Sequence, residues 1–117
     1  MALNDKSAKK ELLAQYRERE IIGCVYLVRN TLNNRLLLDY STDVASIRNR
    51  YEFAQKTGSC VAVKLNNDWL EHGSGAFSFE VLEELKKSET QTDAQYKADL
   101  EFLREAWREK LSNEEFY

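Results

Sequence analysis

The sequence contains few residues of the kinds that force unusual architectures. It has no proline, four glycines, one histidine and two cysteines, Cys24 and Cys60. Two cysteines are too few for a disulfide framework. Because no signal peptide is recognisable, we expect two reduced thiols in a cytoplasmic protein. No apolar run approaches the ~18 residues that a membrane-spanning helix needs. These scarcities exclude a collagen-like chain, a disulfide-stapled mini-protein and an integral membrane protein, and we expect no membrane partner.

The charged residues exclude a strongly basic protein. The 117 residues carry 17 Lys and Arg against 20 Asp and Glu, a net charge of −3, and the acidic excess lies in the last third of the chain. Because Lys and Arg supply the phosphate contacts of nucleic-acid binders, we expect nucleic acid to bind weakly, if at all. Another protein is the alternative partner. The length and a hydrophobic fraction of 43% predict one globular domain.

The hydrophobic periodicity predicts strands and helices in an irregular order. A leader, residues 1–22, includes an expected helix over 7–20, and the domain proper spans 23–117. Strands are expected over 21–30, 35–40 and 77–82, and helices over 44–57, 60–72 and from 92 or 93 onward. This order favours an α+β fold, with a small three-stranded antiparallel sheet flanked by helices.

The same periodicity predicts the core and the helix ends. Asp43 or a neighbouring hydroxyl residue is expected to cap the helix over 44–57, and Gly58 and Gly73 are expected to end helices. His72 and the two cysteines are most simply structural, since no Cys/His spacing is typical of a metal site. The side chains expected to pack around the sheet are Val44, Ile47, Tyr51, Leu65, Trp69, Leu100, Leu103 and Trp107.

A longer pattern covers nearly the whole chain. Gly23-Cys24-Val25-Tyr26 opens a strand, an Asn-rich loop and a second strand follow, and residues 68–85 form the most specific run, with Asp68-Trp69, Gly73 and Phe77-Ser78-Phe79-Glu80-Val81. This succession resembles GIY-YIG nuclease domains, in particular small stand-alone bacterial members of that family. The resemblance implies a three-stranded antiparallel sheet flanked by helices, the same fold that the periodicity favours.

The resemblance also implies a chemistry. Nucleases of this family cleave phosphodiester bonds with one divalent metal ion, two tyrosines, an arginine over the phosphate and a glutamate that holds the metal. A Lewis-acid ion and a cation over the phosphate are what such a displacement needs. Tyr26 matches the first tyrosine. An ungapped alignment then places Leu37 at the second tyrosine, Asp39 at the glycine that follows it, Ile47 at the arginine and Arg104 at the glutamate.

These replacements lead to two hypotheses. The first is a nuclease-like pseudoenzyme that needs no cofactor and acts as a binding or interaction module. The second is a weak Mg²⁺-dependent DNA endonuclease in which Arg48 and Glu105, each one residue beyond the expected position, act with Tyr26. One step along a helix turns a side chain by ~100°, so the sequence favours the first. Tyr26, Arg48 and Glu105 are therefore vestigial catalytic candidates, and no metal ligand is predicted. A third interpretation is an unrelated small α+β domain.

Overall fold

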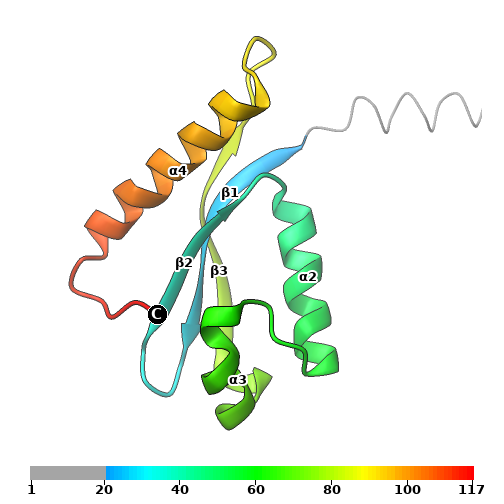
Figure 1. The fold of residues 1–117 in the computed structure, drawn as a ribbon, viewed down its shortest axis with the longest axis vertical. Helices are drawn as coiled ribbons and strands as arrows, with labels where there is room; N and C mark the ends of the chain where they lie inside the picture. Colours follow the sequence, from blue (N-terminus) through cyan, green and yellow to red (C-terminus); the bar gives the residue numbers. More distant parts are fainter. Residues whose placement is uncertain (1–20) are drawn as a thin grey trace, which may run out of the picture.

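The computed structural model describes residues 21–117, and the helix expected over residues 7–20 lies outside the described residues. Strands and helices follow one another along the chain (Figure 1). The strands are β1 (Ile22–Asn30), β2 (Leu36–Ser41) and β3 (Phe77–Lys86). The helices are α2 (Val44–Thr57), α3 (Asn66–His72) and α4 (Asp93–Lys110), and short 3-10 turns at Val63–Leu65 and Ser74–Ala76 flank α3. Within residues 21–117, no helix is both long enough and apolar enough to cross a membrane.

The strands form one antiparallel sheet in the order β2-β1-β3. The central strand β1 is buried over residues 23–28, because helices cover both of its faces, and this explains why both alternating sets of its side chains are apolar. The predicted α+β fold with a three-stranded antiparallel sheet is therefore confirmed. β3 continues four residues beyond its predicted end at Leu82, since its backbone still pairs with β1 beyond a register shift opposite Val25 and Tyr26.

An aromatic core lies between the sheet and α2. The ring centroids of Tyr51 and Phe79 are 5.1 Å apart, and those of Trp69 and Phe77 are 4.9 Å apart. Ile47 is buried beneath α2, as its helical spacing predicted. Aromatic pairs of this kind stabilise the fold by more than the burial of their apolar area alone. The buried members of this cluster are Cys24, Tyr26, Val28, Leu37, Ile47, Tyr51, Ala54, Val61, Leu65, Trp69 and Phe77.

A second, largely aliphatic core lies between the opposite face of the sheet and α4 (Figure 1). Its buried members are Val25, Leu27, Leu36 and Leu38. Leu103 and Trp107 pack against them from α4 but remain half-buried, whereas Leu100, one turn earlier, is fully buried. The predicted apolar stripe of α4 is thus present, but its later residues cover the core only in part.

Local signals fix most helix ends as predicted. Asp43 Oδ1 accepts hydrogen bonds from the backbone N–H groups of Ala45 and Ser46, and Gly58 ends α2 with a φ of 75°. The helix predicted over 60–72 is wrong in its first part. Ala62 is extended, with φ −150° and ψ 141°, so Val61 reaches the core from an irregular segment. Val61 and Leu65 are both buried although a bend and a short 3-10 turn, and not a continuous α-helix, connect them.

One hydrogen-bonded contact joins β1, β3 and α4. The Gly23 N–H donates to the Tyr96 hydroxyl at 2.6 Å, and that hydroxyl donates to the carbonyl of Leu85 at 2.5 Å. A Cβ on Gly23 would lie only 2.9 Å from the Ser41 carbonyl and 3.0 Å from Leu100 Cδ1. The first glycine of the strand motif is therefore required by close packing.

Candidate functional site

A cleft of about 330 Å³ lies beside β2, where α4 and the segment before α3 meet. β2 contributes Leu37, Leu38 and Asp39, the segment before α3 contributes Ala62, Val63 and Lys64, and α4 contributes Arg104 and Arg108. Three positions to which the resemblance assigns nuclease residues, those of Leu37, Asp39 and Arg104, therefore line one cleft. We refer to it below as the β2 cleft.

An ion pair crosses the β2 cleft. Arg104 Nη1 lies 3.4 Å from Asp39 Oδ1, and Arg104 Nε lies 3.3 Å from Glu105 Oε1. Asp39 is opposite Tyr26 in the sheet register and so shares its face. Arg104 comes from the helix on the other face, so the ion pair joins the two sides of the sheet at the β2 edge. The position that the resemblance gives to a metal-holding carboxylate thus carries a cation paired with a carboxylate.

The guanidinium of Arg104 is held by an aromatic ring as well as by charge. Its Cζ lies 5.2 Å from the ring centroid of Tyr40. The Tyr40 hydroxyl in turn donates to Glu101 Oε1 at 2.9 Å, one turn before Arg104 on α4. Three acidic or aromatic side chains therefore fix this cation in the cleft.

Tyr26, the first candidate catalytic residue, lies in the aromatic core. Its side chain is buried, with its ring centroid 5.4 Å from that of Phe79. Burial raises the pKa of its hydroxyl, and the nearby Asp39 carboxylate raises that pKa further. The raised pKa makes the phenolate harder to form than in an exposed tyrosine, which opposes a role in taking a proton from water.

Arg48 and Glu105, the other two candidates, come from helices on opposite faces of the sheet. Arg48 lines a separate hollow of about 470 Å³ between α2 and β3, with Glu52, Gln55 and Phe79 among its neighbours. Glu105 lies on α4 beside Arg104 and Arg108. Within residues 21–117, no hydrogen bond or ion pair links Tyr26, Arg48 and Glu105 to one another.

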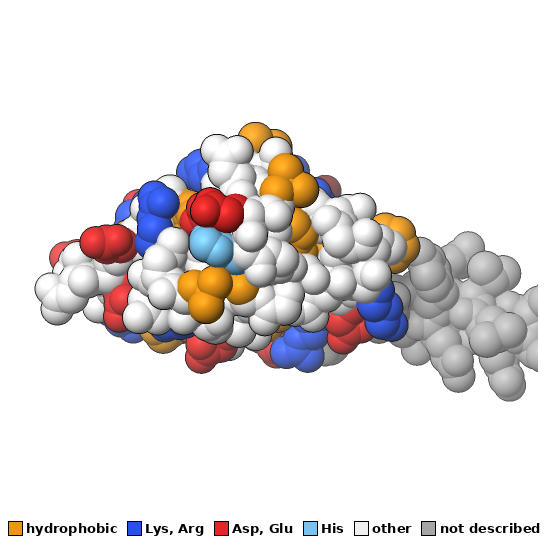
Figure 2. Space-filling view, turned by 90° about the horizontal axis from the view of Figure 1, so that it is seen from below, with side chains coloured by type: hydrophobic (Ala, Val, Ile, Leu, Met, Phe, Trp, Pro, Cys, Tyr) orange, Lys and Arg blue, Asp and Glu red, His pale blue; other side chains and the backbone are white. Residues whose placement is uncertain are grey.

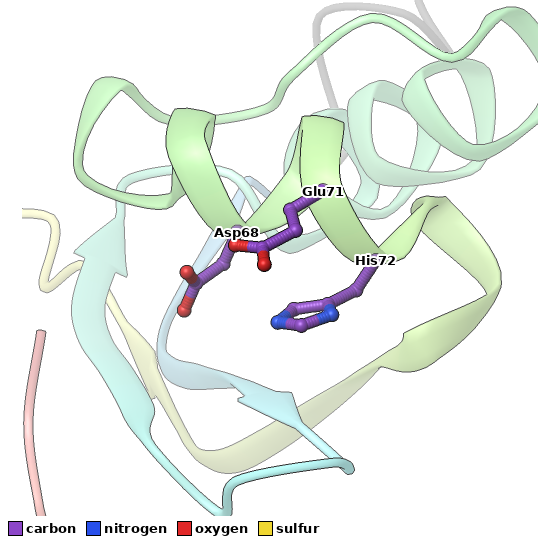
Figure 3. Close-up of side chains that lie close together, drawn as sticks. All are labelled: Asp68, Glu71 and His72. Carbon is purple, nitrogen blue, oxygen red and sulfur yellow. The ribbon is translucent and has the colours of Figure 1, made fainter.

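A second polar group lies on α3, at the end of the molecule seen in Figure 2, where histidine and acidic side chains adjoin on the surface. Asp68, Glu71 and His72 each offer one ligand atom, and these atoms lie within 4.8 Å of one another (Figure 3). These three residues are not among the candidates predicted from the sequence, although their spacings i, i+3 and i+4 on one helix are a signal for such a group.

The Asp68 carboxylate already has a structural role. Its Oδ2 accepts hydrogen bonds from the Tyr117 hydroxyl at 2.6 Å, from Asn33 Nδ2 at 3.3 Å and from Asn30 Nδ2 at 3.4 Å. Asn30 is fully buried, and its Nδ2 also donates to Tyr117 Oη at 2.9 Å. These bonds tie α3 to the β1–β2 loop and to residue 117. They lower the pKa of Asp68, mainly through the Tyr117 hydroxyl.

Comparison with known proteins shows the fold of the chain. No family model matches the sequence, and no curated protein gives a significant match. Among solved structures, a mutant of the catalytic domain of intron endonuclease I-TevI has a TM-score of 0.56 and 22% identity over 79% of this chain and 86% of that chain. A second structure, the catalytic domain of homing endonuclease I-TevI, has a TM-score of 0.49 and 21% identity over 77% and 88% of the two chains. I-TevI is a GIY-YIG endonuclease, so the fold of this chain is GIY-YIG-like.

The sequence indicated the unusual residues of the β2 cleft but not their pairing. Asp39 and Arg104 were each recognised as departures from the family pattern. Their opposite charges at two positions of one expected site were the available signal. The pairing was missed because 65 residues separate them along the chain, and periodicity carries no information on how closely α4 approaches the edge of β2.

Proposed function

We propose that this protein is a GIY-YIG-like domain without nuclease activity, formed by residues 23–117, that acts as a binding or interaction module. The observation that carries the proposal is the ion pair of Arg104 with Asp39 in the β2 cleft. By the resemblance, Arg104 occupies the position of the glutamate that holds the metal. A guanidinium has no lone pair to offer a metal ion and repels it.

The residues present do not fit Mg²⁺ at this site. Among the residues that the structure describes, Asp39 is the one carboxylate that lines the cleft, and the Arg104 side chain already pairs with it at 3.4 Å. The hard cation Mg²⁺ prefers several oxygen ligands in octahedral geometry. The charge and the donor set of the cleft both oppose its binding, so no reaction step is assigned to a metal ion.

The two remaining departures also support the loss of catalysis. Leu37 and Ile47 stand where the resemblance expects a tyrosine and an arginine, and both are buried in the core beneath α2. An alkyl side chain in a packed core cannot stabilise the charge that develops on a phosphate. Catalytic groups that act as a unit fail together rather than additively, so Tyr26 alone would retain little activity.

The decisive test is a plasmid-nicking assay with the purified protein and supercoiled DNA, with Mg²⁺ or Mn²⁺ and with chelator. We expect no metal-dependent nicking. If nicking appears, Tyr26→Phe and Glu105→Ala decide its source, and Glu109→Ala is the matched control because it removes an exposed carboxylate from the same helix. Nicking that is lost in both test variants and kept in the control would overturn the proposal and support the endonuclease that uses Tyr26, Arg48 and Glu105. Nicking that survives every variant would indicate a contaminating nuclease.

A further inference from the structure

The β2 cleft is lined by more positive than negative charge. Among the described residues that line it, Lys64, Arg104 and Arg108 are cationic and Asp39 is anionic, and the neighbouring Glu105 pairs with both arginines. Within residues 21–117, no ion pair engages Lys64. With Asp39 and Glu105 both counted against the three cations, the cleft keeps a net charge of +1, whereas the chain as a whole has a net charge of −3.

Glu105 holds the two arginines next to each other. Its Oε1 lies 3.3 Å from Arg104 Nε, and its Oε2 lies 3.7 Å from Arg108 Nε. At that distance the second contact is an ion pair without a hydrogen bond, so the buried Nε of Arg108 has no acceptor. The Cζ of Arg108 also lies 5.2 Å from the ring centroid of Phe116. Two neighbouring guanidinium groups, one of them incompletely satisfied by the protein, are thus positioned before any ligand arrives.

The size and walls of the cleft limit its ligand. A volume of about 330 Å³ is at the lower end of the range for small-molecule sites, which runs from roughly 300 to 1,000 Å³. Leu37 and Leu38 border the cleft but are only 7% and 5% exposed, whereas Val63 is 93% exposed and offers the main apolar surface. Two arginines and a lysine suit a phosphate group, since guanidinium groups match phosphate oxygens in pairs. The exposed Val63 suits an organic group attached to that phosphate.

The surroundings of the cleft disfavour a long polyanion. Residues 83–117, which include α4, carry six basic and ten acidic side chains. At physiological ionic strength, charges act over about 8 Å, so a small anion in the cleft experiences chiefly the adjacent charges, in which three cations outweigh Asp39 and Glu105. A nucleic-acid strand would extend past them toward the acidic remainder of α4.

We propose that the β2 cleft binds a small organic phosphate monoester of about mononucleotide size, with its phosphate on Arg104, Arg108 and Lys64 and its organic part against Val63. This inference rests on the proposed function, because it requires that the cleft binds an anion instead of a catalytic metal. It names the class of ligand that such a binding module would take.

The test is a titration of the full chain followed by backbone amide NMR, with adenosine monophosphate as the probe. We expect shifts confined to residues 37–39, 62–64 and 104–108, weaker ones with inorganic phosphate and none with adenosine. Arg108→Gln and Lys64→Gln should each weaken binding by about tenfold, the cost of one charge-assisted contact. Lys56→Gln is the matched control, because it removes an exposed cation from α2 on the opposite face.

Three results would overturn this inference: no shift with adenosine monophosphate, shifts elsewhere, or equal shifts with adenosine. A short oligonucleotide that binds the same residues more tightly than the monophosphate, at equal salt, would make nucleic acid the ligand and also overturn it. The outcome is separable from that of the nicking assay. A chain that neither nicks DNA nor binds the monophosphate keeps the proposed function and loses this inference, whereas metal-dependent nicking by the chain removes the proposed function.

Discussion

The two sides of the sheet have replaced nuclease residues in different ways. On the α2 side, Leu37 and Ile47 are each only 7% exposed and belong to the aromatic core. On the α4 side, the Arg104 side chain is 27% exposed and meets Asp39 in an open cleft. Leu37 and Ile47 therefore contribute to core packing, whereas Arg104 contributes to a charged surface.

This contrast separates stability from surface chemistry. Restoring a polar group on the α2 side would place it in a close-packed interior, where an unpaired charge is costly. Changing the charge on the α4 side disturbs a partly solvated ion pair, and such pairs contribute little to stability. We therefore expect the positions matched to the family to respond very differently to substitution.

The largest effect is expected from Ile47→Arg, which restores the charge that the resemblance assigns to this position. Ile47 is buried in the cluster that contains Tyr51 and Leu65, so an arginine there would lose its hydration without gaining a partner. We expect the free energy of unfolding to fall by about 3–5 kcal/mol, measured by urea denaturation. Ile47→Val should cost only about 0.5–1.5 kcal/mol. A loss below about 1 kcal/mol for Ile47→Arg would show that this side of the sheet tolerates the family's arginine.

An intermediate effect is expected at Gly23, where β1 contacts α4 through the Tyr96 hydroxyl. Gly23→Ala would press a methyl group against the Ser41 carbonyl and the Tyr96 hydroxyl, and overpacking of this kind costs about 1–3 kcal/mol. Tyr96→Phe removes one of three obstacles, the others being the Ser41 carbonyl and Leu100 Cδ1, together with the hydrogen bonds to Gly23 and Leu85.

A double-mutant cycle tests whether Gly23 and Tyr96 are coupled. We expect the double variant to be more stable than the sum of the two single losses predicts, by at least about 0.5 kcal/mol. Strict additivity would contradict direct contact and would attribute the cost of Gly23→Ala to the Ser41 carbonyl and the Leu100 side chain.

Most of the fold could be predicted because its signals are local. The alternation in β1, the Asp43 cap and the glycine at position 58 each act within a few residues, and the structure confirms all three. The burial of Ile47 also followed from spacing along one helix. These features depend on backbone geometry and on the face of a single element, which a sequence displays directly.

The candidate site was less predictable because it depends on how distant elements meet. Residues 60–62 have the apolar spacing of a helix but take an extended route that brings Val61 to the core. The half-burial of Trp107 and the pairing of Arg104 with Asp39 both depend on how α4 lies across the sheet. No period in the sequence encodes that placement, so charge and packing at the β2 cleft became evident only from the structure.

A smaller effect on stability is expected from Arg104→Glu, which restores the family's carboxylate in the β2 cleft. It would place a second acidic group beside Asp39, and we expect a loss of about 1 kcal/mol or less in urea denaturation. The informative readout is its metal dependence, since paired carboxylates favour a divalent cation. Millimolar Mg²⁺ should raise the stability of this variant and leave the wild type unchanged. Arg104→Gln removes the cation without adding a ligand, and a Mg²⁺ response in that control would attribute the effect to another site.

The smallest effect is expected from Tyr117→Phe, at the far end of β2. The Tyr117 hydroxyl donates to Asp68 and is the main cause of that carboxyl's lowered pKa. A group whose pKa is lowered in the folded state stabilises the fold above its ordinary pKa, which is 3.8 here, and this contribution is lost as the pH falls through the folded-state value. The variant keeps the aromatic ring, whose centroid lies 4.5 Å from Arg35 Cζ, so packing is preserved.

We expect Tyr117→Phe to be slightly less stable than the wild type near neutral pH, with a difference that shrinks as the pH is lowered below about 4. Urea midpoints measured for both proteins across this range test the expectation. A difference that stays constant with pH would mean that the hydroxyl acts through its bond with Asn30 rather than through the ionised Asp68.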